Sequence, residues 1–316
     1  MQIGNKFRCY PDKRQQEILH RWIGCQRFIY NAKVREDRYF RSFSRQSLSL
    51  AGMKTPVDQK YAQFISEETV WLKDTPSQLL RNGATLWKQA YQRFFNGLAK
   101  RPKLHKRIGR QSVWITSELF NFMESDGKHS VQLGSKSRVI GSIPFKAHRE
   151  FNAPASIHIS VDAGQWFLSF SYDDGVPEAK EEDVFAYVAS LSRPDIEAST
   201  IGIDRNTTGK KVATSSGQSF DYSGLQKKRM LEHERKSRRW QRIQARRTKG
   251  SKRYGKAKAK VARYKRYAKN TRHDFAHKTS RTLVDQTGVN VFVSKRCKQQ
   301  VWFDLQKALL MLPERK

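Results

Sequence analysis

The most informative segment of this chain reads Ile201-Gly-Ile-Asp-Arg-Asn206 and continues, after two threonines, as Gly209-Lys-Lys-Val-Ala-Thr-Ser-Ser-Gly217. The pattern predicts a strand, a short turn and a second strand. Ile201 and Ile203 share one face of the first strand, so Asp204 lies on the other. Strands disfavour aspartate, and one reason to place a carboxylate there is to hold a metal ion. A two-metal site needs several such carboxylates, so the function depends on whether the chain supplies partners for Asp204.

The charge of the chain limits its partners. The 316 residues include 62 Lys and Arg against 29 Asp and Glu, for a net charge of +33. A compact chain this positive repels itself unless a polyanion neutralises it, and nucleic acid is the polyanion that we expect. An anionic membrane is the rival, but there is no apolar run long enough to span one and no apolar signal region at the N-terminus. We expect a cytoplasmic, nucleoid-associated protein of about two domains.

The first hundred residues predict two helices. Residues 5–10 form a short strand that Pro11 ends, and Asp12 caps a helix. A loop is expected over residues 44–60. Thr75 is predicted as the N-cap of a second helix, with Pro76 in its first position and its end near residue 97. Both helices carry apolar residues at helical spacing, namely Ile18, Trp22, Cys25, Ile29 and Ala32 in the first and Leu80, Ala84, Trp87, Tyr91, Phe94 and Leu98 in the second.

From about residue 108 the apolar residues alternate, which predicts strands. Asp126-Gly127 and residues 162–164 are turn signals, so we expect an antiparallel meander that closes as a small barrel. The strand at 5–10 precedes the helices, so they split this barrel. Residues 173–199 are locally acidic and predict an interdomain linker.

Residues 227–272 are strongly basic, with 21 Lys and Arg against only Glu232 and Glu234. Two helices broken between Gly250 and Gly255 fit this segment. The second helix carries a packing stripe of Ala257, Val261, Tyr264, Ala268, Thr271 and Phe275. One-sided charge of this extent favours contact with a nucleic-acid backbone over a merely solvated face. A strand at 289–293 and a short amphipathic segment at 301–312 follow.

The cysteines and histidines of the sequence do not predict a metal site or a reactive thiol. Cys9, Cys25 and Cys297 form no Cys-x-x-Cys pair, so we expect reduced thiols. His273 and His277 are four residues apart on a helix, which would suit a metal pair, but packing or RNA contact is the favoured interpretation.

Five segments, in order, resemble the TnpB family, the transposon-encoded RNA-guided nucleases related to type V CRISPR effectors. They are Tyr10-Pro11 with Gln16 and Gly24-Cys-Gln-Arg-Phe-Ile-Tyr-Asn31, then Ala90-Tyr-Gln-Arg-Phe-Phe-Asn-Gly97 with Pro102 and Lys103, Gly164-Gln-Trp-Phe-Leu-Ser-Phe170, Ile201-Gly-Ile-Asp-Arg-Asn206 with Val212, Ala213 and Gly217, and Arg272-His-Asp-Phe-Ala-His-Lys278.

The resemblance implies an α+β multidomain fold. A helical recognition lobe, residues 11–104, is inserted in a small antiparallel wedge-type β-barrel made of residues 1–10 and 105–175. An acidic linker over residues 176–198 leads to a truncated RNase H-like (RuvC) α/β domain over residues 199–316, without a zinc finger or the last catalytic motif.

The resemblance also exposes a departure. An active family member carries a catalytic glutamate just after the strand at 289–293, where this chain has Ser294 and Lys295. A lysine would repel a metal ion, and one carboxylate does not make a two-metal site. We therefore expect Asp204 to be vestigial, the nuclease to be inactive, and no functional magnesium or zinc site.

The expected function is RNA-guided DNA binding that represses transcription by occupying a promoter. The expected partners are a guide RNA and double-stranded target DNA with a short flanking motif, in a monomeric ribonucleoprotein. Two alternatives stay open. The first is an active RNA-guided endonuclease whose site is completed by a displaced acid, such as Asp274 or Asp304. The second is a decayed transposon remnant with non-specific nucleic-acid binding.

The predicted nucleic-acid contacts are basic residues of both halves of the chain. They are Arg8, Arg27, Lys100, Arg101, Lys103, Lys106, Arg107, Lys227, Lys228, Arg229, Arg235, Arg238, Arg239, Arg242, Arg246, Arg247, Lys252, Arg253, Lys256, Lys260, Arg263, Lys265, Arg266, Arg272 and Lys278.

Overall fold

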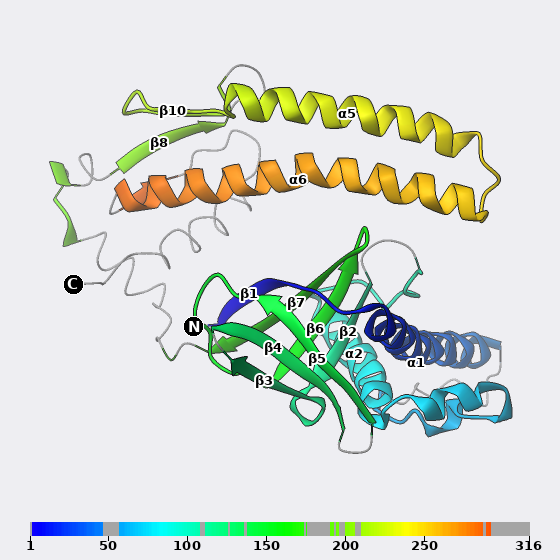
Figure 1. Cartoon of the computed structure of the whole chain (residues 1–316). Coiled ribbons are helices and arrows are strands. Elements are labelled where there is room, and N and C mark those ends of the chain that lie inside the picture. The colour runs from blue at the N-terminus through cyan, green and yellow to red at the C-terminus, as the bar shows by residue number, and fades with distance from the viewer. Residues whose placement is uncertain are drawn as a thin grey trace. The chain divides into compact units, whose positions relative to one another are not determined.

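The chain folds as two compact units that meet in sequence at residues 175 and 176 (Figure 1). The computed structural model describes residues 2–46, 57–107, 111–125, 127–135, 138–173, 175, 190–192, 194–195, 200–205, 210–286 and 289–291. Each unit is described by itself. Most of the predicted linker, the positions 294 and 295, and the segment 301–312 lie outside these ranges.

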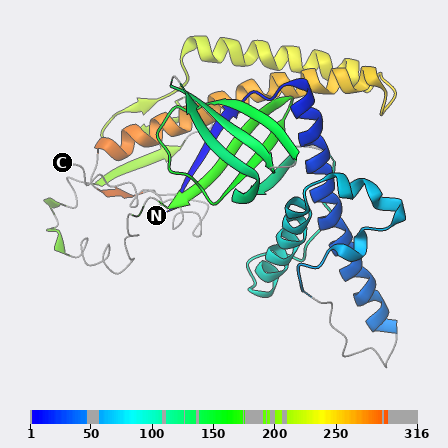
Figure 2. The same cartoon turned by 60° about the horizontal axis from the view of Figure 1, so that its bottom comes forward.

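The N-terminal unit is built on a curved, antiparallel seven-stranded sheet (Figure 2). In the order β2-β6-β7-β1-β5-β4-β3, its strands are β2 (Gln111–Thr116), β6 (Ser156–Asp162), β7 (Gln165–Asp173), β1 (Gln2–Cys9), β5 (Arg138–Lys146), β4 (Lys128–Ser135) and β3 (Phe120–Ser125). The strand before the helices therefore joins the strands after them, as predicted. Within the described ranges β2 and β3 form two edges and the sheet does not close, so the predicted barrel is not confirmed.

The period-two pattern selects the buried face of this sheet. Val113 and Ile115 of β2, and Ile157 and Ile159 of β6, are all fully buried. Phe7 of β1 is also fully buried and lies 5.6 Å from the ring of Phe145 between centroids. Aromatic rings at this spacing add to the burial of apolar area, so the core sits on the inner face of the sheet.

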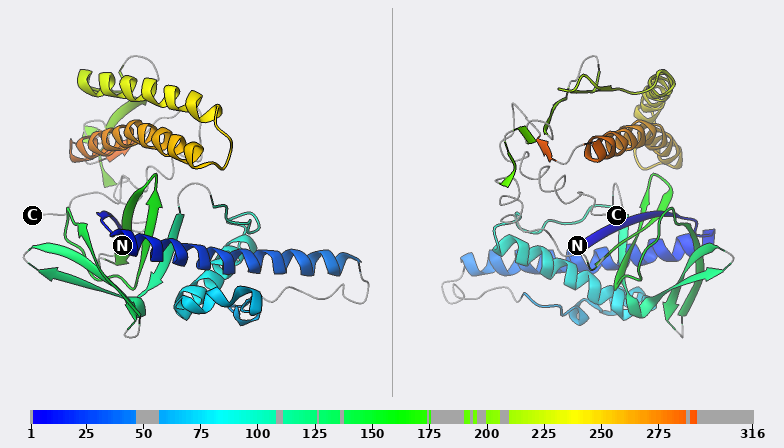
Figure 3. Two further views of the ribbon diagram at one scale, coloured as in Figure 1. Left: turned by 45° about the vertical axis from the view of Figure 1, so that its right-hand side comes forward. Right: turned by 90° about the vertical axis from the view of Figure 1, so that its left-hand side faces the viewer.

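Two helices pack beside the sheet, α1 (Lys13–Gln46) and α2 (Ser77–Phe95) (Figure 3). Asp12 caps α1 as predicted, since its Oδ1 accepts the backbone N–H of Gln15 at 2.7 Å. The predicted N-cap role of Thr75 is wrong. Pro76 occupies that position without a side-chain cap, and the hydroxyl of Thr75 instead donates to Cys25 Sγ at 3.0 Å.

Short helical turns connect these helices, η2 (Ala62–Phe64) and η3 (Glu67–Asp74). A further turn, η4 (Ser117–Leu119), joins β2 to β3. The loop predicted over 44–60 is wrong for residues 44–46, because α1 continues to Gln46, and residues 47–56 lie outside the described ranges.

The C-terminal unit has a small mixed sheet of order β10-β9-β8-β11. Its strands are β8 (Thr200–Arg205), β9 (Val212–Thr214), β10 (Ser219–Phe220) and β11 (Val289–Val291). Neighbours β8, β9 and β10 are antiparallel, whereas β11 runs parallel to β8. Ile203, Val212 and Leu283 are buried together, with Ile201 packed against them. The predicted face of Ile201 and Ile203 is therefore the core face.

Two long helices, α5 (Gly224–Ala245) and α6 (Lys252–Gln286), complete this unit. They lie side by side as an antiparallel hairpin (Figures 1 and 3). Ser223 begins α5 with a capping box to Gln226. The turn comes before residue 252, with Gly250 at a φ of 93°. Gly255 lies inside α6, so the break ends earlier than the sequence predicts.

Candidate nucleic-acid interface

The hairpin of α5 and α6 is held by two facing stripes of side chains. On α6, Ala257 and Val261 are 2% and 8% exposed, which confirms the predicted packing stripe. On α5, a row of buried or half-buried side chains has members spaced by three and four residues, namely Met230, His233, Ser237, Trp240 and Gln244. This heptad-like spacing is typical of two helices that pack along their lengths. The spacing of apolar residues did not predict the α5 stripe, because most of its members are polar or amphipathic.

Aromatic and cationic side chains fill the seam between these stripes. The ring of His233 stacks on Tyr267, with centroids 4.1 Å apart and planes at 13°. The Lys260 ammonium lies 4.0 Å from the centroid of the Trp240 ring, a cation–π contact. Arg266 is 8% exposed, so it belongs to the seam and not to the outer surface. The seam is therefore more polar than an ordinary helical core.

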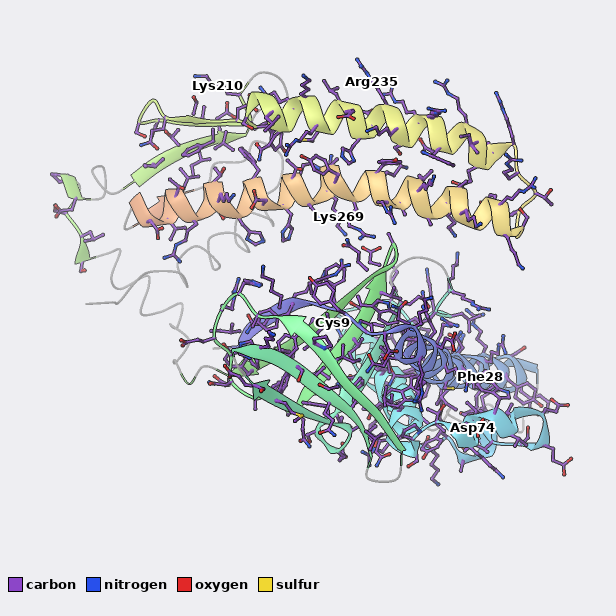
Figure 4. The ribbon with its side chains drawn as sticks, in the orientation of Figure 1. Cys9, Phe28, Asp74, Lys210, Arg235 and Lys269 are labelled. Carbon is purple, nitrogen blue, oxygen red and sulfur yellow. The ribbon has the colours of Figure 1, made fainter. Side chains whose placement is uncertain are left out.

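The outer surface of the hairpin is covered by cations. Figure 4 labels Arg235 on the side of α5 away from α6, and Lys269 on α6. Apart from Arg266, every predicted nucleic-acid contact between residues 227 and 278 is exposed. The structure adds further exposed cations that the prediction omitted, namely Lys236, Lys249, Lys258, Lys269 and Arg281.

The few acids of the hairpin are already engaged by neighbours one turn away. Glu234 pairs with Arg238 at 2.6 Å, Asp274 with Lys278 at 3.1 Å, and Asp285 with Arg281 at 2.9 Å, while Glu232 pairs with Lys236. Residues 224–286 hold 23 Lys and Arg against these four acids. Most of the cations are therefore left to a partner, and a polyanion is the partner that their charge favours.

The basic residues of the N-terminal unit form a separate group. Lys100, Arg101, Lys103, Lys106 and Arg107 are exposed. The other two predicted contacts in this unit, Arg8 and Arg27, are half-buried. Arg8 lies over the rings of Tyr10 and Phe167, at 5.7 and 5.3 Å, and Arg27 donates to the side chain of Gln111.

Asp204 lies near the C-terminal end of β8, an inner strand of the small sheet. It is exposed on β8 and opposite Ala213 of β9. The parallel register pairs Val291, the last residue of β11, with Gly202. In the part of the chain that is described, no three His, Cys, Asp or Glu side chains converge as metal ligands. Ser294 and Lys295 lie outside that part.

The two histidines of α6 do come together. Their Nε2 atoms are 3.3 Å apart, and both side chains are exposed. Asp274, between them in sequence, pairs with Lys278.

Comparisons with known proteins match two segments of the chain to family models. A family model described as "Helix-turn-helix domain" matches residues 1–39, and one described as "Probable transposase" matches residues 179–294. Within residues 2–39 the structure contains β1 and part of the continuous helix α1, and not two helices joined by a turn.

Two curated relatives match most of the chain. A Streptomyces pristinaespiralis protein named "Putative RNA-guided DNA endonuclease" is 26% identical over 88% of this chain and 63% of its own length. The Escherichia coli K12 protein named "Putative RNA-guided DNA endonuclease InsQ" is 27% identical over 87% of this chain and 61% of its own length. The chain thus spans less than two thirds of either relative. No helix in the described ranges is long and apolar enough to cross a membrane.

Proposed function

On the premise that this chain belongs to the TnpB family, we propose that it binds a guide RNA and, through that RNA, a double-stranded DNA target. The exposed cations of α5 and α6 are the observation that carries this proposal. Their surplus over four locally paired acids suits a polyanionic duplex, which a protein recognises through its backbone while base pairing reads the sequence. The basic residues of the N-terminal unit would then contact the scaffold of the RNA or the DNA beside the target.

We further propose that the bound complex does not cut its target. The support comes from residues within the chain, because Ser294 and Lys295 follow the strand after which the resemblance expects a glutamate. The parallel pairing of β11 with β8 sets Val291 opposite Gly202, two residues before Asp204. Under this proposal Lys295 would lie near Asp204, where it would oppose the two cations that such catalysis requires.

A DNA-bound complex without nuclease activity would act by occlusion. Bound at a promoter, it would exclude RNA polymerase and repress transcription. The sequence of the target would be set by the RNA, and a short flanking motif would be read by the protein.

The first experiment is to purify the protein with its RNA and sequence that RNA. One species with a constant scaffold and a variable end is the expected result, and the variable end would name the target. The matched variant replaces Arg235, Arg239 and Arg242 on the outer side of α5 by glutamine, with folding checked by circular dichroism. We expect it to lose bound RNA or target DNA. A heterogeneous mixture of unrelated RNA would contradict guided binding.

An active endonuclease is the second candidate, because the relatives bear that name. The test is magnesium-dependent cleavage of a target that matches the purified RNA, compared between the natural chain and the Asp204→Ala variant. Under the proposed function both bind the target equally and neither cuts it. Cleavage that Asp204→Ala abolishes would overturn the inactive assignment and leave RNA-guided binding intact.

Non-specific binding is the third candidate, and the net charge of +33 favours it. The discriminating measurement is the ratio of affinities for matched and mismatched duplexes at fixed salt. A ratio near one would establish this candidate.

A further inference from the structure

A short basic segment of the N-terminal unit is clamped to α1 by one asparagine. The side chain of Asn31 donates from Nδ2 to the carbonyl oxygen of His105 at 3.1 Å. Its Oδ1 accepts the backbone N–H of the same residue at 2.8 Å. Both backbone groups of His105 are therefore satisfied by one side chain, which fixes this residue although it lies in no helix or strand.

The ring of His105 is fixed as well. It stacks on Tyr30 with centroids 3.8 Å apart and planes at 10°. Tyr30 is 5% exposed, whereas His105 as a residue is exposed. One face of the imidazole is thus covered, and the remainder is open to a ligand in solvent.

Arg27 lies one turn earlier on the same face of α1, since residues 27, 30 and 31 are spaced as helical neighbours. Its guanidinium donates to Gln111 Oε1, and Gln111 Nε2 donates to the carbonyl oxygen of Lys106 at 3.1 Å. The segment that contains His105 and Arg107 is therefore held from two sides, by Asn31 and by Gln111.

Positive charges converge at this point. The pKa of Arg27 is lowered by burial and by the charge of Arg107, and the pKa of His105 is lowered by burial and by the charge of Arg27. Among the described ion pairs, none involves Arg27, His105 or Arg107. Holding cations together without a counterion costs free energy that an anionic ligand would recover.

We propose that Arg27, His105 and Arg107 form a preassembled site for one phosphodiester group of a nucleic acid, with Asn31 and Tyr30 as its positioning residues. This site rests on the proposed function. It deepens that function by adding a specific phosphate contact in the N-terminal unit, apart from the α5–α6 hairpin of the C-terminal unit. Guanidinium groups suit phosphate recognition, and a protonated imidazole adds a third donor.

Occupation of the site by a phosphate should favour protonation of His105. Tyr30 and Arg27 of α1 act on His105, Tyr30 by stacking on its ring and Arg27 by its charge, while Lys106 and Arg107 are its neighbours on its own segment. Burial and the charge of Arg27 oppose the imidazolium in the free protein. The pKa of Tyr30 is raised by burial, so this phenol stays neutral near pH 7. A phosphate offsets the repulsion, and by linkage the affinity rises as the pH falls through the pKa of His105 in the complex.

The test measures binding of the full-length protein to two probes, the RNA that co-purifies with it and a 30-base-pair DNA duplex. Arg107→Gln should reduce the slope of log affinity against log salt by about one for the probe that occupies the site. His105→Gln should abolish the gain in affinity between pH 8 and pH 6 for the same probe. Lys13→Gln is the matched control, because Lys13 is exposed at the start of α1 and outside the site.

The probe that responds identifies the source of the phosphate as RNA or DNA. Asn31→Ala should reproduce the Arg107→Gln effect while the α5–α6 cations still bind. If Arg107→Gln and His105→Gln match Lys13→Gln in salt slope and pH dependence with both probes, the site is refuted. That result is distinct from failure of the proposed function, which would appear as heterogeneous RNA or as unchanged binding by the α5 variant.

Discussion

At the scale of single residues, the segment from Gly24 to Asn31 joins α1 to its surroundings one side chain at a time. Gln26 is buried, and its Nε2 donates to the carbonyl oxygens of Leu79 and Trp114, at 3.2 and 2.9 Å. Its Oε1 accepts the backbone N–H of Trp114 at 2.9 Å. Cys25 and Asn31 reach two further segments. The motif that resembles the family signature is therefore a set of connections between α1, α2 and β2.

Gln26→Leu should destabilise the N-terminal unit. The substitution keeps a similar volume but leaves a buried N–H and two carbonyl groups without their partner, at a cost of roughly 1–3 kcal/mol for each group left unpaired. Urea unfolding monitored by circular dichroism measures the change. Gln92→Leu, at an exposed position of α2, is the control. Equal midpoints for the two variants would contradict the role given to Gln26.

The buried thiols should be unreactive in the folded protein. Burial raises the pKa of Cys9 to about 12 and raises the pKa of Cys25. The thiolate is the reactive form, so we expect no alkylation of either by iodoacetamide at pH 8. Peptide mass spectrometry before and after denaturation in urea checks this. Rapid labelling of Cys9 in the folded state would show that β1 opens.

At the scale of elements, the periodicity of apolar residues predicted which face of a strand or helix is buried. The alternation of residues 111–173 and the α6 stripe gave the correct inward faces. Thr75 failed as a cap because its hydroxyl satisfies Cys25, a partner 50 positions away. The α5 stripe was missed because His233 and Ser237 carry no hydrophobic signal. Closure of the sheet depends on pairing between distant strands, which no local pattern encodes.

The same limit applies to the candidate interface. Net charge and its concentration between residues 227 and 272 predicted the exposed cations well. The same prediction included the buried Arg266 among the exposed cations, because the sequence of a basic segment does not distinguish a buried arginine from an exposed one. The sequence did not predict His105 as a candidate site residue, because its backbone is held by Asn31, which lies 74 positions earlier in the chain.

Gly83→Ala tests the crossing of α1 and α2. A Cβ atom on Gly83 would lie 2.7 Å from the carbonyl oxygen of Gln26 and 3.2 Å from Ile29 Cβ. The helices must move apart, which should cost about 1–3 kcal/mol. Gly24→Ala is the control on α1, because its Cβ would meet nothing within 4 Å, and it should stabilise the helix by about 0.5–1 kcal/mol. Thermal unfolding of both variants should give shifts of opposite sign.

At the scale of the whole molecule, the two units present two basic surfaces on different scaffolds. The N-terminal surface is small and held by hydrogen bonds, whereas the α5–α6 surface is long and carries most of the charge. The acidic composition of residues 173–199 predicted an interdomain linker, most of which lies outside the described residues, and the two compact units divide between residues 175 and 176.

Affinity for nucleic acid should therefore fall steeply with salt. Replacing Arg235, Arg239 and Arg242 by glutamine should lower the slope of log affinity against log salt by about 0.9 for each phosphate of duplex DNA that the variant no longer neutralises. Titrations between about 50 and 200 mM salt measure the slope. The control replaces Lys13, Arg14 and Arg21, three exposed cations of α1, by glutamine. A slope equal to that of the control would show that α5 does not bind phosphate.

The polar seam between α5 and α6 also affects how fast the protein is degraded when no nucleic acid is bound. Few aliphatic side chains hold the two helices together, while many like charges drive them apart. Without a bound polyanion, we expect the helices to separate often enough for proteases to reach the backbone. Limited trypsin digestion should cut first between residues 224 and 286, and added RNA should protect this region. Under the proposed function, such preferential degradation of RNA-free molecules in a cell would keep the amount of protein matched to the amount of its guide RNA.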